Sequence, residues 1–147
     1  MENLTILNSK EKKNIYMLIN EQFGCDLGKE YEVFMNSRNR IFLLNKDFVK
    51  IDISQLRVNS LGLYFGEIYN NELRLSIEGS QLIGKTAKKN VLDLEDEQAA
   101  KWMKGEDFEI DSDLKEFVLV KNNSIFLGCG KISNKRLYNY VPKERRV

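Results

Sequence analysis

Four apolar residues near the start of the chain recur with helical spacing: Ile15, Leu18, Ile19 and Phe23. This period predicts an amphipathic helix over residues 9–23. Asn8 suits the N-cap because its side chain can accept from the backbone three residues on, where Glu11 completes a capping box. Gly24 supplies the C-terminal stop.

Shorter apolar runs bounded by turn residues follow and predict strands. The expected strands of this half are Tyr31–Asn36, Arg40–Leu44, Leu61–Tyr69 and Glu72–Ile77. Asn70 and Asn71 predict a two-residue hairpin turn, since asparagine tolerates positive φ. Lys46–Gln55 is expected to be a short helix or irregular, and Ser80–Gly84 a single helical turn.

After the charged stretch Lys85–Asn90, many short strands and one helix are expected. The helix is Glu95–Met103, ending at Gly105, with acidic residues in its first turn. The expected strands are Val91–Leu94, Phe108–Ile110, Phe117–Val120, Ser124–Lys131, around a turn at Asn122-Asn123, and Arg136–Val141. This pattern is typical of a small β-barrel or pseudobarrel.

Composition narrows the function classes. The 147 residues can bury a core as one domain or as two small ones sharing a core. The chain has no histidine, which removes the usual general base and histidine-dependent nucleophile activation. We expect no enzyme, catalytic residue, metal site or cofactor. Two separated cysteines, a polar start and the lack of a long apolar run predict a cytoplasmic protein.

The net charge of +1 hides a polarised second half. Residues 93–116 hold ten acidic residues and three lysines, whereas residues 131–147 hold six basic residues and one glutamate. Tyr138 and Tyr140 lie among the cations of this tail. Cations neutralise phosphates and aromatic rings stack on bases, so the tail suits RNA, although a solvated basic strand with core tyrosines explains it equally well.

Three short motifs have a plainer interpretation. Gly79–Thr86 fits the pattern of a phosphate-binding loop, but the strand before it alternates charged and apolar residues, unlike the buried parallel strand such a loop follows. The run Gly128-Cys129-Gly130 indicates close packing or a bulge around a buried thiol. The carboxylates of Glu95, Asp96 and Glu97 favour a helix N-terminus more than a metal.

The second half resembles the PUA domain, an RNA-binding pseudobarrel. The resemblance is carried by Val91–Leu94, Trp102-Met103-Lys104-Gly105-Glu106, Phe117-Val118-Leu119-Val120 and Leu127-Gly128-Cys129-Gly130-Lys131, which is similar to the family's last strand. Residues 59–66 and 73–77 are similar to the ribosome-assembly factor Nip-seven, which has an α/β domain before its PUA domain. The tail, residues 130–146, resembles that of RsmF-type rRNA cytosine-C5 methyltransferases. Their S-adenosylmethionine loop and catalytic Pro-Cys motif have no counterpart in this sequence.

The resemblance implies an α+β fold, with a pre-PUA α/β domain at 1–87 and a PUA-type β-pseudobarrel at 88–147. It implies binding to structured rRNA or tRNA in RNA modification or ribosome maturation, with an RNA-modifying enzyme or a ribosome-assembly factor as the expected protein partner. The helix, its glycine loop and the last strand would face RNA, with Trp102 more often a core residue than a base-stacking one. The implied RNA-binding residues are Lys101, Lys104, Gly105, Lys131, Lys135, Arg136, Tyr138, Lys143, Arg145 and Arg146.

Two alternatives from other classes stay open. The acidic segment 93–116 could dock a basic protein partner, which would make the chain a protein-interaction module. Gly79–Thr86 could bind a nucleotide.

Overall fold

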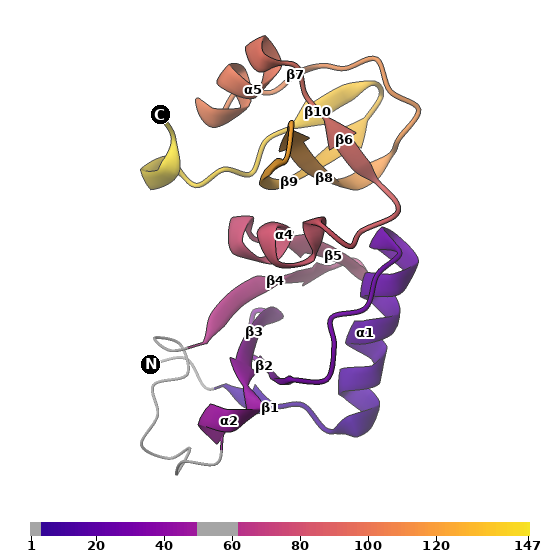
Figure 1. Ribbon diagram of the computed structural model, residues 1–147, viewed down its shortest axis with the longest axis vertical. Helices are drawn as coiled ribbons and strands as arrows, with labels where there is room; N and C mark the ends of the chain where they lie inside the picture. Colours follow the sequence, from indigo (N-terminus) through magenta and orange to yellow (C-terminus); the bar gives the residue numbers. More distant parts are fainter. Residues whose placement is uncertain (1–3, 50–61) are drawn as a thin grey trace.

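The structure, a computed structural model, describes residues 4–49 and 62–147. Within these residues the strands form two five-stranded sheets, one in each half of the sequence (Figure 1). The fold is therefore α+β, as predicted. No helix in the described part is long and apolar enough to cross a membrane.

The first sheet is an antiparallel meander with the strand order β1-β2-β3-β4-β5. Its strands are β1 (Thr5–Ile6), β2 (Tyr31–Met35), β3 (Arg40–Asn45), β4 (Leu63–Tyr69) and β5 (Glu72–Leu75). Asn70 and Asn71 both have positive φ, at 50° and 61°, so the predicted hairpin turn is confirmed. The two-residue β1 was not predicted. Residue 61 of the predicted strand Leu61–Tyr69 and residues 50–55 of the predicted segment Lys46–Gln55 lie outside the described residues. The described part of that segment, Lys46–Val49, forms the short helix α2.

Helix α1 (Ser9–Phe23) begins and ends where its capping residues predict. The Asn8 side chain accepts from the Glu11 amide at 2.9 Å, and Glu11 accepts from the Asn8 amide at 3.0 Å. Gly24 ends the helix in the left-handed conformation, with a φ of 67°. The helix buries Ile15, Ile19 and Phe23 against the first sheet.

Helix α4 (Ile77–Gly84) corrects two expectations. The strand predicted to reach Ile77 ends at Leu75, and the helix is longer than the single turn predicted at Ser80–Gly84. The reason is Ser76, whose hydroxyl accepts from the Gly79 amide at 2.9 Å and thereby caps the helix. An N-cap residue has extended backbone, so it looks like strand in a pattern of apolar and polar residues.

The second sheet has the order β6-β8-β9-β10-β7, with β6 parallel to β8 and the other pairs antiparallel. Its elements are β6 (Val91–Asp93), α5 (Asp96–Met103), β7 (Phe108–Glu109), β8 (Glu116–Asn122), β9 (Ile125–Ser133), β10 (Arg136–Tyr138) and the 3-10 turn η2 (Lys143–Arg145). The β8–β9 turn is Asn123-Ser124, one residue later than predicted. The last strand ends at Tyr138 rather than Val141, because Asn139 turns the chain.

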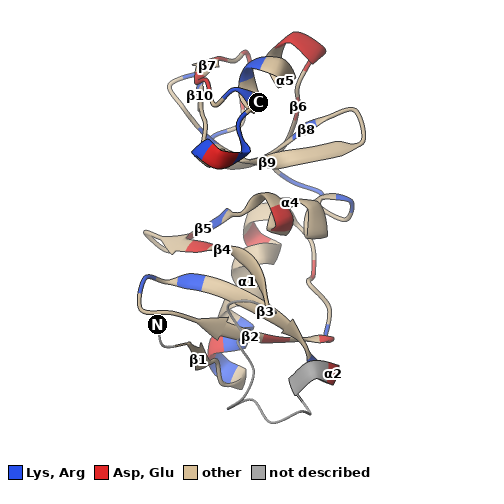
Figure 2. Ribbon diagram, turned by 90° about the vertical axis from the view of Figure 1, so that its left-hand side faces the viewer, with Lys and Arg blue, Asp and Glu red and all other residues tan. Residues whose placement is uncertain are grey.

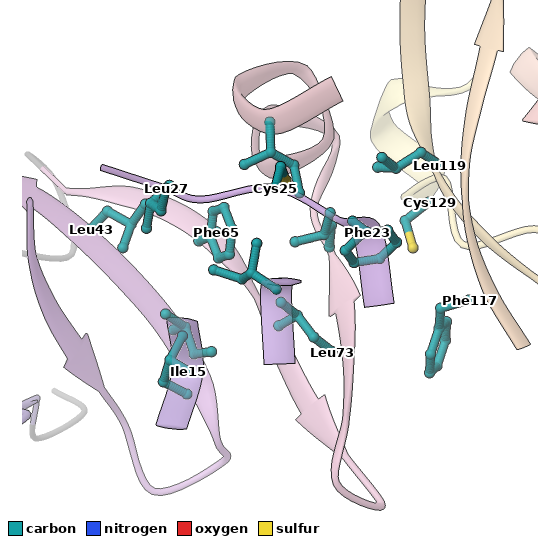
Figure 3. Close-up of a cluster of buried hydrophobic side chains, with 14 of the residues drawn as sticks. Ile15, Phe23, Cys25, Leu27, Leu43, Phe65, Leu73, Phe117, Leu119 and Cys129 are labelled. Carbon is teal, nitrogen blue, oxygen red and sulfur yellow. The ribbon is translucent and has the colours of Figure 1, made fainter. Parts of the chain in front are cut away.

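One hydrophobic cluster joins the two halves. Phe117, Leu119 and Cys129 of the second sheet pack with α1, α4 and the first sheet (Figure 3). A second cluster fills the inside of the β6–β10 unit around Trp102, which is fully buried. The chain crosses from one sheet to the other between α4 and β6 (Figure 1). A division into separate domains at 87/88 stays a prediction.

Candidate nucleic-acid interface

The C-terminal tail packs directly against the glycine loop after α5. Gly105 has a φ of 87°, and a side-chain carbon there would overlap the Arg146 guanidinium. Arg146 Nε donates to the Val141 carbonyl at 3.1 Å, and the Val147 amide donates to the Met103 carbonyl at 2.9 Å. The α5 loop and the tail, which the resemblance assigns to one surface, thus lie side by side (Figure 2).

Asn139 holds the tail in this position. Its side-chain amide donates to the Trp102 carbonyl at 2.8 Å and to the Glu106 carbonyl at 3.2 Å. Its backbone amide donates to the Asp107 carboxylate at 2.8 Å. A single asparagine therefore connects β10 to the end of α5, and the residues after it are carried across the loop.

Five of the predicted cations lie on α5 or the tail that crosses its loop, and all five are exposed: Lys101, Lys104, Lys143, Arg145 and Arg146. Arg145 forms an ion pair with Glu78 of α4, so its charge is partly compensated. We call these five residues and Gly105 the tail–loop surface. Exposed cations on neighbouring segments attract a polyanion, and the exposed carboxylates of the same loop and tail, Glu106, Asp107 and Glu144, oppose this attraction.

The remaining predicted residues lie on β9, on β10 and in the turn between them. Tyr138 is paired with Lys131 across the two strands, which places their side chains on one face. Lys131 is half-buried, 3.7 Å from Glu116 and 5.4 Å from the centre of the Phe117 ring. Tyr138 is 38% exposed. An exposed ring beside a cation is a suitable platform for a base.

Two predicted cations stand in acidic surroundings instead. Arg136 is paired with Glu109 across β10 and β7. Lys135, in the β9–β10 turn, lines two hollows with carboxylates of the 109–116 segment. The structure therefore does not bring these two together with the tail–loop surface.

Trp102 does not belong to an exposed surface, because its side chain is fully buried. Tyr140, which lies among the tail cations but was not predicted as a site residue, contacts the first half of the chain. Its ring centre is 4.7 Å from the Arg74 guanidinium and 6.2 Å from the Phe117 ring centre. Sequence spacing gives no signal for the Arg74 contact, since 66 positions separate the two residues.

The phosphate-loop pattern at Gly79–Thr86 forms a helix rather than a loop. Gly79 lies against β4, where a side-chain carbon would overlap the Phe65 carbonyl oxygen, and Gly84 lies against the Phe126 ring. The Ser80 amide donates to the Ser76 carbonyl at 2.9 Å. The glycines therefore serve packing, and this part of the chain presents no cradle of free amides.

The other motifs also have structural roles. Complete burial raises the pKa of the Cys129 thiol to about 12, which keeps it protonated, as expected of a core thiol. In the acidic segment, Asp93 accepts from the Asn123 amide and Asp96 from the Asn122 side chain. Glu95 forms a capping box with Gln98 at the start of α5. These carboxylates hold the β6–β10 unit together.

Comparison with known proteins supports the resemblance. A protein-family model, the methyltransferase RsmF PUA domain, matches residues 89–147. The ribosomal RNA small subunit methyltransferase F of Vibrio parahaemolyticus is 27% identical over 143 residues, which cover 93% of this chain and 30% of that protein. The protein of the same name from Vibrio campbellii has the same identity and coverage. The chain thus spans about a third of the length of these curated relatives, and the family model matches their PUA domain rather than a catalytic domain.

Proposed function

We propose that this chain, whose residues 89–147 form a PUA domain of the RsmF methyltransferase type, binds structured ribosomal RNA and takes no chemical part in its modification. The observation that carries the proposal is the packing of the tail over Gly105. It brings the cations of α5 and of the tail, 39 or more positions apart in sequence, onto neighbouring segments beside the β9–β10 face that carries Tyr138.

The chemistry of this surface favours phosphate contacts. Lysine and arginine side chains at exposed positions neutralise backbone phosphates and release counterions, which gives affinity without reading the sequence. Double-helical RNA is recognised mostly in this way, through its shape and its backbone, because its deep major groove is closed to side chains. Gly105 lets the loop backbone come close to a phosphate, since it carries no side chain.

We infer an rRNA target rather than a tRNA target because the matching relatives carry ribosomal RNA small subunit methyltransferase in their names. Their substrate is theirs, and its transfer to this chain is part of the proposal. A role in ribosome maturation in the cytoplasm, beside a modifying enzyme or an assembly factor, would follow from such a target.

A direct test changes three exposed lysines of the tail–loop surface to glutamine: Lys101, Lys104 and Lys143. Binding to fluorescein-labelled fragments of small-subunit rRNA, followed by anisotropy, should weaken by at least tenfold. The matched control changes three exposed lysines elsewhere to glutamine: Lys10, Lys85 and Lys115. Both variants lose three positive charges, so equal losses of affinity would mean that net charge, and not this surface, binds RNA.

The same assay separates the alternatives. If the chain has no RNA affinity at low salt but binds a basic protein, the protein-interaction module is favoured. The carboxylates of Asp93 and Asp96 accept hydrogen bonds from within the chain, which makes them less available to a partner.

A further inference from the structure

A cavity of about 370 Å³ lies where the two halves meet, beside the tail. This volume is within the range of small-molecule sites, about 300–1,000 Å³. Its walls come from β3, β4 and β5, from the start of α4, from β9 and from the tail, with Trp102 of α5 behind Gly128. Its lining includes Arg40, Tyr64, Arg74, Trp102, Tyr140 and Arg145.

Two buried N–H groups at this cavity have no hydrogen-bond acceptor among the described residues: Arg40 Nε and Trp102 Nε1. A buried donor without an acceptor loses its hydrogen bonds to water without replacement, so native structures rarely keep one. Gly128, which also lines the cavity, lies next to this indole, because a side-chain carbon there would stand 3.9 Å from Trp102 Nε1. Two such donors lining one cavity indicate a ligand that brings acceptor atoms.

Three arginines and two glutamates line the cavity, which leaves one positive charge in excess to attract an anionic ligand. Arg40 and Glu67 are paired across β3 and β4, and Glu67 is 2.8 Å from Arg74. Glu67 is thus ion-paired with Arg74, whereas Arg40 forms no ion pair among the described residues. Arg145 is paired with Glu78, and Glu144 also lines the cavity. The N-terminal turn of α4 borders it as well, with its Gly79 amide already donating to the Ser76 hydroxyl.

Aromatic rings complete the walls. The Arg40 guanidinium lies 5.9 Å from the centre of the Tyr64 ring, and Arg74 lies 4.7 Å from that of Tyr140. Guanidinium planes and aromatic rings are the groups on which unstacked bases of RNA stack. The cavity thus combines aromatic rings for stacking, two buried N–H donors without acceptors and one positive charge in excess.

We propose that this cavity holds one unpaired ribonucleotide of the bound RNA, with its phosphate near Arg40 and an acceptor of its base on Trp102 Nε1. The proposal rests on the proposed function, because the tail that docks RNA also forms a wall of the cavity. It adds a contact that requires a splayed-out nucleotide, whereas the tail–loop surface requires only phosphates.

Trp102 is the chain's single tryptophan, so its indole N–H gives one resonance in a ¹H–¹⁵N correlation spectrum. The experiment titrates the ¹⁵N-labelled chain with the four ribonucleoside 5′-monophosphates, with the nucleosides, with inorganic phosphate and with a single-stranded RNA oligonucleotide. A hydrogen bond to a new acceptor should move the indole resonance with at least one monophosphate and with the oligonucleotide. Nucleosides and phosphate alone should move it less at equal concentration.

Arg40→Gln should weaken the monophosphate effect by about tenfold, because it removes both the charge and the unpaired donor. Arg38→Gln is the matched control, since Arg38 is exposed in the same β2–β3 connection and does not line the cavity. Thermal melts of both variants check that they fold. If Arg40→Gln unfolds, the wild-type titration still decides the question.

Each other outcome overturns part of the proposal. RNA binding with an unmoved indole resonance would refute the cavity site and leave the proposed function standing. An equal shift with inorganic phosphate would make the cavity an anion site and not a nucleotide site. A monophosphate effect without any RNA binding would refute RNA as the source of the nucleotide, and no effect of either kind would refute both proposals.

Discussion

Replacing Gly79 by alanine should destabilise the chain although alanine is the better helix former. Gly79 lies inside α4, where the change to alanine by itself stabilises by about 1 kcal/mol. Its position is packed against β4, however, and the added carbon would overlap the backbone oxygen of Phe65. Backbone of a central strand cannot move aside as a side-chain end can, so the helix must shift away from the sheet.

Forcing an extra carbon into a packed site costs about 1–3 kcal/mol. We expect the upper end for a backbone clash, which leaves a net loss of about 2 kcal/mol, or roughly 5 °C in melting temperature for a chain of this size. Urea denaturation followed by circular dichroism measures the free energy of unfolding. Lys85→Ala, at an exposed position, is the control and should change it by less than about 0.5 kcal/mol.

The two variants also distinguish packing from phosphate binding. If the pattern at Gly79–Thr86 were a phosphate loop, Lys85→Ala would abolish ATP or GTP binding in calorimetry, and Gly79→Ala would harm binding more than stability. A Gly79→Ala variant that is more stable than the wild type would show that α4 does not pack on β4 as described.

Three further predictions concern single side chains. Tyr138→Ala should lower RNA affinity by about 1–3 kcal/mol at an unchanged salt slope, with little loss of thermal stability, because the ring is exposed; a larger loss of stability than of affinity would make it a packing residue. Burial raises the pKa of Tyr16 to about 12, helped by Asp26. Between pH 10 and 12 the unfolded chain thus loses the Tyr16 proton before the folded chain does, so the free energy of unfolding should fall as pH rises. Urea titration should show a smaller fall in Tyr16→Phe, and an equal fall in both proteins would contradict the raised pKa. Burial raises the pKa of both cysteine thiols, so thiol reagents should label Cys25 and Cys129 slowly until urea unfolds the chain, and rapid native labelling would refute their burial.

Local signals account for the parts of the fold that could be predicted. The ends of α1 depend on Asn8, Glu11 and Gly24, each within the helix or next to it, and the β4–β5 turn depends on two adjacent asparagines. The strand β1 escaped prediction because its two residues are strand only through pairing with β2, about 30 positions away. A pattern of apolar and polar residues does not show whether a segment becomes a strand through its own residues or through pairing with a distant strand.

The same limit applies to the candidate site. The cations of α5 and the tail could be named from the sequence, but their neighbours could not. Arg136 and Lys135 belong to the same basic segment, yet strand pairing sets them among carboxylates. The cavity could not be predicted at all, because Arg40 of β3 and Trp102 of α5 stand 62 positions apart in different halves of the chain.

The salt dependence of RNA binding tests the central claim most directly. Four cations of the tail–loop surface have no ion pair among the described residues: Lys101, Lys104, Lys143 and Arg146. Each neutralised phosphate contributes about 0.7–0.9 to the slope, so log K for a small-subunit rRNA fragment should fall with log salt at a slope of about −3. In the variant with Lys101, Lys104 and Lys143 changed to glutamine, the slope should be about −1. A slope near zero for the wild-type chain, or the same slope in both proteins, would contradict docking on RNA phosphates through this surface.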